Sequence, residues 1–131
     1  MLFRSPALLR VALLGVALSL VLSIQLSNVF GAIGRSKQVK TMAALRALGV
    51  PFDKHLATLP TSRRFGPADA WGNPIVIATQ PGRYVIVSFG ECGIPDRPDP
   101  WRYPAGPTSS YDDDVVYSNG QFLRYPEGVQ Q

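Results

Sequence analysis

Three consecutive aspartates stand in the stretch "SSYDDDVVYSNGQF", at the start of an apolar run. The carboxylates of Asp112, Asp113 and Asp114 repel one another, so water, a partner or a cation must make their proximity tolerable. Ca²⁺ is held by about six to eight oxygens from carboxylates, carbonyls and water, and it tolerates irregular loops. In an extended segment alternate side chains face opposite ways, so Asp112 and Asp114 share a side that Asp113 does not. These residues leave two alternatives open, a calcium site and a solvated acidic loop.

Acidic residues are clustered, although the formal net charge of the chain is +4. Six of the nine carboxylates lie between positions 91 and 114, which places Glu91 and Asp96 among the possible oxygen donors. The basic residues are scattered and do not alternate with aromatic residues, as a nucleic-acid-binding surface would require. We therefore expect no nucleic-acid partner.

The other reactive side chains stand alone. The chain has a single cysteine, Cys92, which excludes an internal disulfide and a multi-thiolate metal site. No imidazole lies near Cys92 in the sequence, and the only histidine, His55, has no matched nucleophile. The sequence contains no phosphate loop, zinc pattern or serine-histidine-carboxylate arrangement. We expect that the protein is not an enzyme.

An uncharged stretch near the N-terminus determines the organisation of the chain. No charged residue lies between Arg10 and Arg35, and about 20 apolar residues are enough for a helix to span a bilayer. A cleaved secretory signal with its apolar region at 11–24 is the alternative. The apolar character continues past Ile24 to Ile33 without a good cleavage site, which favours a retained anchor helix at 1–34. The remainder, 35–131, is then an exported domain.

The anchor is predicted to continue into an amphipathic helix over 35–48. Apolar residues recur there at helical spacing, opposite a face of lysine, threonine and arginine. Gly49 and Pro51 are expected to end the helix, as a C-terminal cap and as a residue that cannot continue it. An irregular connector is expected over 51–70, because it contains three prolines.

Two hairpins are predicted beyond the connector. The first covers 74–89, with a turn at Gln80-Pro81-Gly82, and the second covers 115–125, with a turn at Asn119-Gly120. Residues 90–111 between them have five prolines and little periodicity, which is typical of a long functional or disordered loop. The fold class is therefore α+β, a long N-terminal helix packed on a small antiparallel β-sheet of about four strands.

This plan resembles that of type IV pilins and pseudopilins. "DAWGNPIVI" is similar to the "DPWGNPY" stretch of the major (G-type) pseudopilins of type II secretion. From the residues themselves, we interpret Trp71 as an aromatic anchor at a turn. "RYVIVSFGECG" is similar to their "YDLYSLGADG", and "DDDVVYS" to their "DDI" ending. The resemblance covers roughly 35–118, and it is strongest at 69–75.

The resemblance implies a calcium ion between the last strands. The paired aspartates of the family fall on Asp113 and Asp114, with Asp112 beside them. The first loop aspartate of the family falls on Cys92, a poor calcium ligand, so the adjacent Glu91 is the expected substitute. Backbone carbonyls near Ser88 and Phe89 would complete the site.

The N-terminus departs from the family pattern. Pilin-like proteins begin with a basic leader, a Gly-Phe junction and a glutamate five residues into the mature helix, and that glutamate is needed in assembly. This sequence has no such junction and no glutamate before Glu91. It is therefore either a divergent, unprocessed pseudopilin or an anchored relative that does not polymerise.

The resemblance further implies a structural role in a type II secretion or type IV pilus-like assembly. The expected partners are the membrane, other pilin-like subunits or secretion-system components, and further copies of the same chain. The expected location is the bacterial inner membrane, crossed once, with the C-terminal domain in the periplasm. The alternative is a membrane-tethered periplasmic binding module that uses the 90–111 loop and does not polymerise. A small anchored hydrolase has no supporting constellation.

Overall fold

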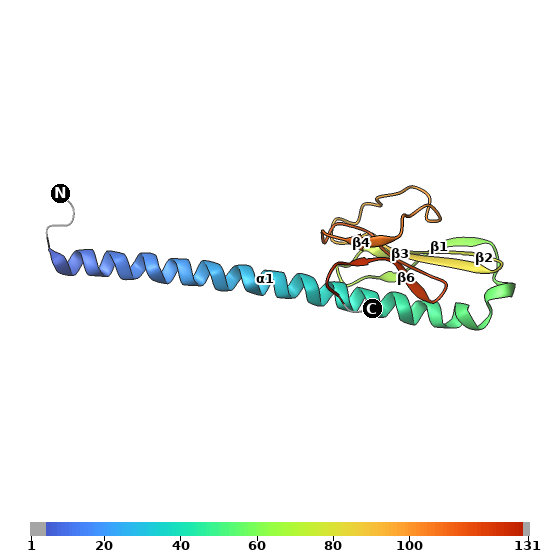
Figure 1. The fold of residues 1–131 in the computed structure, drawn as a ribbon, viewed down its shortest axis with the longest axis horizontal. Coiled ribbons are helices and arrows are strands. Elements are labelled where there is room, and N and C mark those ends of the chain that lie inside the picture. Colours follow the sequence, from blue (N-terminus) through green and yellow to red (C-terminus); the bar gives the residue numbers. More distant parts are fainter. Residues whose placement is uncertain (1–4, 130–131) are drawn as a thin grey trace. The chain divides into compact units, whose positions relative to one another are not determined.

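The computed structural model describes residues 5–129, which form one long helix and a six-stranded sheet (Figure 1). The elements in chain order are α1 (Pro6–Lys54), a 3₁₀ helix η1 (Leu56–Thr58), β1 (Ser62–Ala68), β2 (Pro74–Gln80), β3 (Arg83–Ser88), β4 (Gly106–Thr108), β5 (Val115–Ser118) and β6 (Gln121–Pro126). The strand order is β1-β2-β3-β5-β6-β4. This arrangement confirms the predicted α+β fold with a long N-terminal helix packed on a sheet. The sheet is larger than predicted and mixed, because β4 pairs with β6 in parallel.

The chain divides into two compact units, one ending at Arg35 and the other beginning at Ser36. The first unit is the apolar part of α1. The second contains the remainder of α1 and all the strands. The expected hairpins correspond to β2–β3 and to β5–β6, whose turn contains Asn119 with a φ of 48°.

The predicted end of the helix at Gly49 and Pro51 is wrong, because α1 continues to Lys54. Pro51 has no N–H to donate to the carbonyl of Ala47, and Ala47 is exposed, so water can satisfy this carbonyl. Gly49 is a packing position instead of a cap. A Cβ atom at Gly49 would lie 2.6 Å from Cε1 of Tyr117 and 2.8 Å from the hydroxyl oxygen of Tyr84.

The predicted irregular connector at 51–70 is also wrong, because it contains the edge strand β1. This strand pairs antiparallel with β2, and its register shifts between Phe65 and Ala68. Two arginines and Pro67 gave it little strand character in the sequence. Charged residues, a proline and a bulge are common at sheet edges because they hinder unwanted pairing with other chains.

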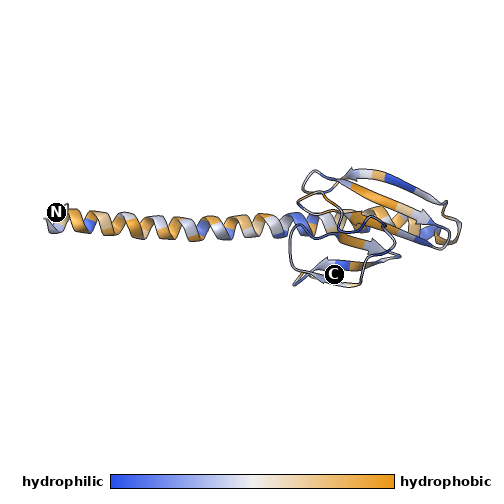
Figure 2. Cartoon of the chain, turned by 90° about the horizontal axis from the view of Figure 1, so that it is seen from above, coloured by the Kyte–Doolittle hydropathy of each residue, from blue (hydrophilic) through white to orange (hydrophobic). Residues whose placement is uncertain are grey.

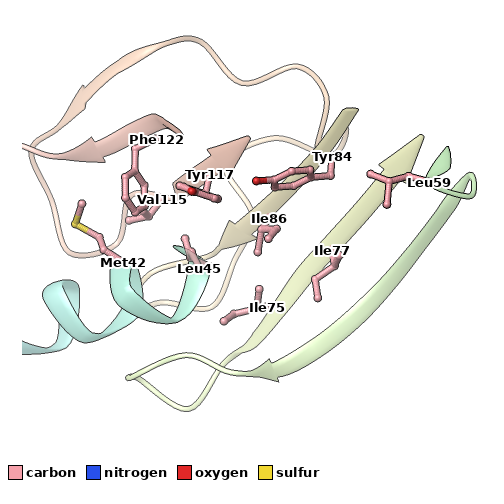
Figure 3. Close-up of a cluster of buried hydrophobic side chains, with 10 residues drawn as sticks. All are labelled: Met42, Leu45, Leu59, Ile75, Ile77, Tyr84, Ile86, Val115, Tyr117 and Phe122. Carbon is pink, nitrogen blue, oxygen red and sulfur yellow. The ribbon is translucent and has the colours of Figure 1, made fainter. Parts of the chain in front are cut away.

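One face of the sheet packs against the second half of α1 (Figure 3). Met42 and Leu45 of the helix belong to a cluster with side chains from four strands and from the connection after η1. The buried members of this inner core are Met42, Leu45, Leu59, Ile75, Ile77, Tyr84, Ile86, Val115, Tyr117 and Phe122. Tyr117 and Phe122 meet edge to face, with ring centroids 4.8 Å apart. The burial of these apolar side chains holds α1 on the sheet.

The opposite face of the sheet is covered by the segment at 90–105. Phe89 and Tyr103 pack there on alternate residues of the central strands, Val76, Ala78, Val85, Val87 and Val116. Trp101 joins this outer core, and the guanidinium carbon of Arg83 lies 4.2 Å from the centre of its ring. Both faces of β2 and β3 are therefore buried. The predicted long loop at 90–111 is in part a covering layer, and it also contains β4.

Candidate functional site

The first half of α1 exposes an almost continuous apolar surface. Its most apolar 18-residue window has a mean hydropathy of 2.4, and none of that window is buried in the structure. Apolar colouring predominates along this half of the helix (Figure 2). The helix is long and apolar enough to cross a membrane, by length and composition. The same length and composition near an N-terminus fit both a single-pass membrane helix and a signal sequence.

Small residues recur every fourth position along this apolar half, at Gly15, Ser19, Ser23, Ser27 and Gly31. Each of the three serine hydroxyls donates a hydrogen bond to the carbonyl four residues earlier, over 2.9 to 3.1 Å. The hydroxyls are thus satisfied within the helix, as an apolar environment requires. Lines of small residues at this spacing allow helices to approach closely in membranes.

The three predicted aspartate ligands have different surroundings. Asp112 is exposed, Asp113 is half-buried and Asp114 is completely buried. Oδ2 of Asp113 accepts hydrogen bonds from the backbone amides of Ser109 and Ser110, over 3.1 and 3.0 Å. Asp113 therefore closes its own turn, and its position gives it a structural role with or without a cation.

Asp114 is the centre of a buried polar network. Its Oδ2 accepts a hydrogen bond from the amide of Asp96 at 2.8 Å and a short one from the hydroxyl of Tyr103. The amide of Asp114 in turn donates to Oδ2 of Asp96 at 2.9 Å, so the two aspartates hold each other. A guanidinium nitrogen of Arg124 lies 3.8 Å from the same Asp96 oxygen. This network ties the covering segment to the start of β5.

The second carboxylate oxygen of Asp114 has no partner. Oδ1 is the only buried side-chain oxygen or nitrogen without a hydrogen bond among residues 5–129. Burial raises the pKa of Asp114 from 3.8 to about 6, although the bonds from Tyr103 and from the Asp96 amide act in the opposite direction. Burial and the bond to Asp114 also raise the pKa of Tyr103 above its usual range. A buried acceptor without a donor is costly, which makes Oδ1 the point where a cation or a proton would be stabilised.

The remaining predicted ligands do not join this network. Glu91 is exposed, and its amide donates to the carbonyl of Tyr111. The hydroxyl of Ser88 donates to Oδ2 of Asp69 at 2.7 Å. The thiol of Cys92 lies 3.5 to 3.7 Å from the carbonyl oxygens of Phe89, Ile94 and Asp112. Of these three carbonyls, that of Phe89 belongs to the backbone at which the family resemblance implies an ion ligand.

Gly90 allows two segments of this region to approach each other. It has a φ of 69°, and a Cβ atom there would lie 2.5 Å from the carbonyl oxygen of Tyr111 and 2.9 Å from that of Asp113. A larger residue at position 90 would therefore push the aspartate turn away from the end of β3.

The "DAWGN" turn links the helix, the sheet and the loop. Oδ1 of Asp69 accepts hydrogen bonds from the amides of Trp71 and Asn73, both at 3.0 Å, while the amide of Ala70 donates to Thr41 of α1. The side-chain amide of Asn73 donates to the carbonyl of Gly90 at 2.9 Å. This agrees with the interpretation of Trp71 and its neighbours as a structural turn.

The predicted calcium ligands therefore come from two segments, 88–91 and 112–114, and their polar groups form separate contacts. Within 5–129, no group of three or more histidine, cysteine, aspartate or glutamate side chains is placed to hold a metal ion. A site of the expected kind would rely mainly on backbone carbonyls and on Asp114, whose free Oδ1 fits a cation. The ligand set stays a prediction. Tyr103 was missed, because an aromatic residue 11 positions away gives no local signal of a contact with Asp114.

Cys92 and His55 lie at opposite ends of the sheet. His55 precedes η1, where Leu56 accepts a hydrogen bond from the amide of Gly82 in the β2–β3 turn. Cys92 follows β3 at its other end. The two side chains therefore do not meet, and they form no thiol–imidazole pair.

Comparisons of the chain with models of protein families, with curated proteins and with solved structures find no match.

Proposed function

We propose that this protein is a pilin-like structural subunit of a type II secretion or type IV pilus-like assembly. The observation that supports the proposal is that the two halves of the single helix α1 have different surroundings. Its first half exposes apolar side chains, and its second half supplies Met42 and Leu45 to the inner core. A subunit of this design sits in the membrane before assembly and packs by the same helix afterwards. The folded domain would face the periplasm.

The length of α1 is sufficient for both tasks. Its 49 residues correspond to about 74 Å at about 1.5 Å per residue, whereas a bilayer core is about 30 Å thick. The line of small residues from Gly15 to Gly31 gives the apolar half a surface for close helix packing. Packing in lipid depends on such contacts, because lipid tails are as apolar as the side chains.

Calcium binding at the aspartate turn is part of the proposal. Asp114 would be the buried ligand, since Oδ1 has no hydrogen-bond partner. A bound cation would compensate the buried charge of Asp114 and tie the covering segment to β5.

The absence of an acidic residue in the first turn of α1 favours the alternative of a tethered module that does not polymerise. The two functions differ in whether full-length copies associate through α1. Two copies with different affinity tags, expressed together and extracted in mild detergent, should purify together if the protein is a subunit.

Two matched substitutions connect this association to the helix surface. Ser23→Ile places a large side chain on the line of small residues, and we expect it to reduce co-purification several-fold. Ala17→Ile makes a similar change off that line and should leave co-purification unchanged. Failure of the unmodified copies to purify together would refute the assembly role and favour the tethered module.

A further inference from the structure

The edge strand β1 presents a basic and aromatic surface. Arg63 and Arg64 are exposed, and neither guanidinium forms an ion pair within the described residues. Phe65 is 71% exposed, although it is the largest apolar side chain of the strand. These three residues and Val76 line a hollow of about 300 Å³. We call this surface the basic edge. Residues 54–68 around it contain no carboxylate.

A surface of opposite charge lies where β3 ends and β5 begins. Residues 91–114 carry six carboxylates against two arginines. Arg102 already pairs with Asp99, at 3.2 Å, and Arg124 with Asp96. Glu91 and Asp112 are exposed and form no ion pair within the described part of the chain. We call Glu91 and Asp112 with their turn the acidic turn.

The two surfaces do not pair with each other within one molecule, since neither Arg63 nor Arg64 forms an ion pair among the described residues. Arg63 is in register with Ala78, and Ala78 with Val85 in the middle of β3, whereas Ser88 is the last residue of β3 and is in register with Val115. Val85 and Ser88 are about 10 Å apart along the strand. Glu91 and Asp112 lie further on, beyond Ser88 and before Val115. The basic edge lies beside the middle of the sheet, and the acidic turn lies beyond one end of β3, so the two are separate surfaces of the domain.

We propose that the basic edge of one copy binds the acidic turn of the next copy, head to tail. This inference rests on the proposed function and names its partner as a second copy of the same chain. Complementary charge supports this partner, since two unpaired guanidiniums on one surface meet two unpaired carboxylates on the other. Arginine binds carboxylates through paired hydrogen bonds, and the ring of Phe65 offers apolar contact beside them.

A contact between two different surfaces of identical chains has a structural consequence. Each copy keeps one free surface of each kind after pairing, so the assembly is open-ended unless the rotation between copies closes a ring. The charged pairs lie at the rim, where they orient the copies more than they add affinity. Their effect should fall with salt, because screening acts over about 8 to 10 Å at moderate ionic strength.

The test uses the single native cysteine, which follows Glu91 in the acidic turn. In the full-length protein reconstituted in liposomes with chelator, Ser62→Cys adds a second thiol at the basic edge. Mild oxidation should then give a ladder of dimers, trimers and longer species. The unmodified protein and the Ser62→Cys/Cys92→Ser variant have one thiol each and can give dimers at most.

Charge reversal identifies the contact. In the two-cysteine protein, Arg63→Glu with Arg64→Glu should reduce the species above dimer at least fivefold. Adding Glu91→Arg and Asp112→Arg to the same chain should restore them. Lys40→Glu with Glu127→Lys changes exposed charges elsewhere and should leave the ladder unchanged. High salt should weaken the ladder of the two-cysteine protein but not its folding.

The outcomes separate this inference from the proposed function. If tagged copies purify together but the ladder is absent, or if it is indifferent to charge reversal, the head-to-tail contact is wrong and the helix-mediated assembly stands. If reversing the charges of the basic edge abolishes the ladder, and reversing those of the acidic turn as well does not restore it, the contact is likewise wrong. If tagged copies do not purify together at all, the assembly role itself is refuted.

Discussion

The stability of the protein without calcium should fall as pH rises from about 4 to about 7, and Asp114 should cause this. The carboxyl group has a pKa of 3.8 in the unfolded reference and of about 6 in the folded chain, where it is completely buried. Between these values the folded state binds more protons than the unfolded state, so stability falls with rising pH. The full difference corresponds to about 3 kcal/mol, which is present below the lower pKa and lost above the higher one.

Asp114→Asn removes the titration and keeps an oxygen for the bonds from Tyr103 and the Asp96 amide. The full-length protein in detergent, with chelator, would be unfolded by urea at a series of pH values and followed by tryptophan fluorescence. Trp101 lies in the covering segment and reports on its release. Other carboxylates also titrate, so the informative quantity is the free energy of unfolding of the wild type minus that of the variant. This difference should decrease by about 2.4 kcal/mol from pH 4 to pH 7.5, because pH 4 already lies just above the lower pKa.

Asp113→Asn is the matched control. It weakens the closure of the turn at Ser109 and Ser110 but should retain the pH dependence of the wild type. A flat difference between wild type and Asp114→Asn, or one that increases with pH, would show that burial does not raise this pKa.

Calcium should oppose the loss of stability at high pH. A cation at Oδ1 favours the ionised carboxylate, and at about one hundred times its dissociation constant it would stabilise the fold by about 2.7 kcal/mol. The effect should appear at pH 7.5, nearly vanish at pH 4 where Asp114 is protonated, and be absent in Asp114→Asn. If calcium leaves the wild type unchanged at pH 7.5, the calcium site is lost here and the network around Tyr103 closes the segment without it.

Two further substitutions test contacts that the sequence did not reveal. Gly49→Ala should destabilise the domain by about 1 kcal/mol in urea unfolding, because overpacking against Tyr84 and Tyr117 outweighs the higher helix propensity of alanine; a stabilised variant would mean that the rings move aside at no cost. Tyr103→Phe should cost about 1.5 to 3 kcal/mol at pH 7.5. It should also move the pH transition upward, because the lost hydrogen bond lowers the pKa of Asp114; an unchanged transition would exclude Tyr103 from the network.

The elements with regular periodicity could be predicted from the sequence. The β-branched run of β2, the Asn119-Gly120 turn and the apolar stripe with Met42 and Leu45 each obey a local rule, and each forms the expected element. β1 has no such pattern, because as an edge strand it buries little and its exposed side chains are free to be polar. Its strand conformation depends on pairing with β2, which is a long-range property.

The predicted end of the helix was wrong for a related reason. Gly49 and Pro51 are common stop signals, but tertiary packing against Tyr84 and Tyr117 decided the outcome. The hydroxyl of Tyr84 also donates to Asp53 at 2.7 Å and accepts from the amide of Gly120 at 2.9 Å, so the last turn of α1 is tied to the β5–β6 hairpin. A local rule could not weigh these contacts, because their residues are more than 30 positions apart.

The aspartate cluster illustrates how a correct signal can have several origins. Three adjacent carboxylates indicated that their negative charges need compensation, and in the structure each carboxylate is compensated in a different way. Asp112 is solvated, Asp113 accepts two backbone amides, and Asp114 is held by Tyr103 and by the amide of Asp96.

The covering segment at 90–105 contains few aliphatic residues, and it is ordered by aromatic packing instead. Tyr103 and Trp101 bury their rings on the outer face of the sheet, and Arg83 stacks on Trp101. Ordering this segment costs conformational entropy, which the burial of two large rings can offset in part. The segment that leads into the acidic turn is therefore held on the outer core before any ion or partner arrives. A surface that is already ordered loses less entropy when it binds, and this makes the acidic turn suited to contact another copy of the chain.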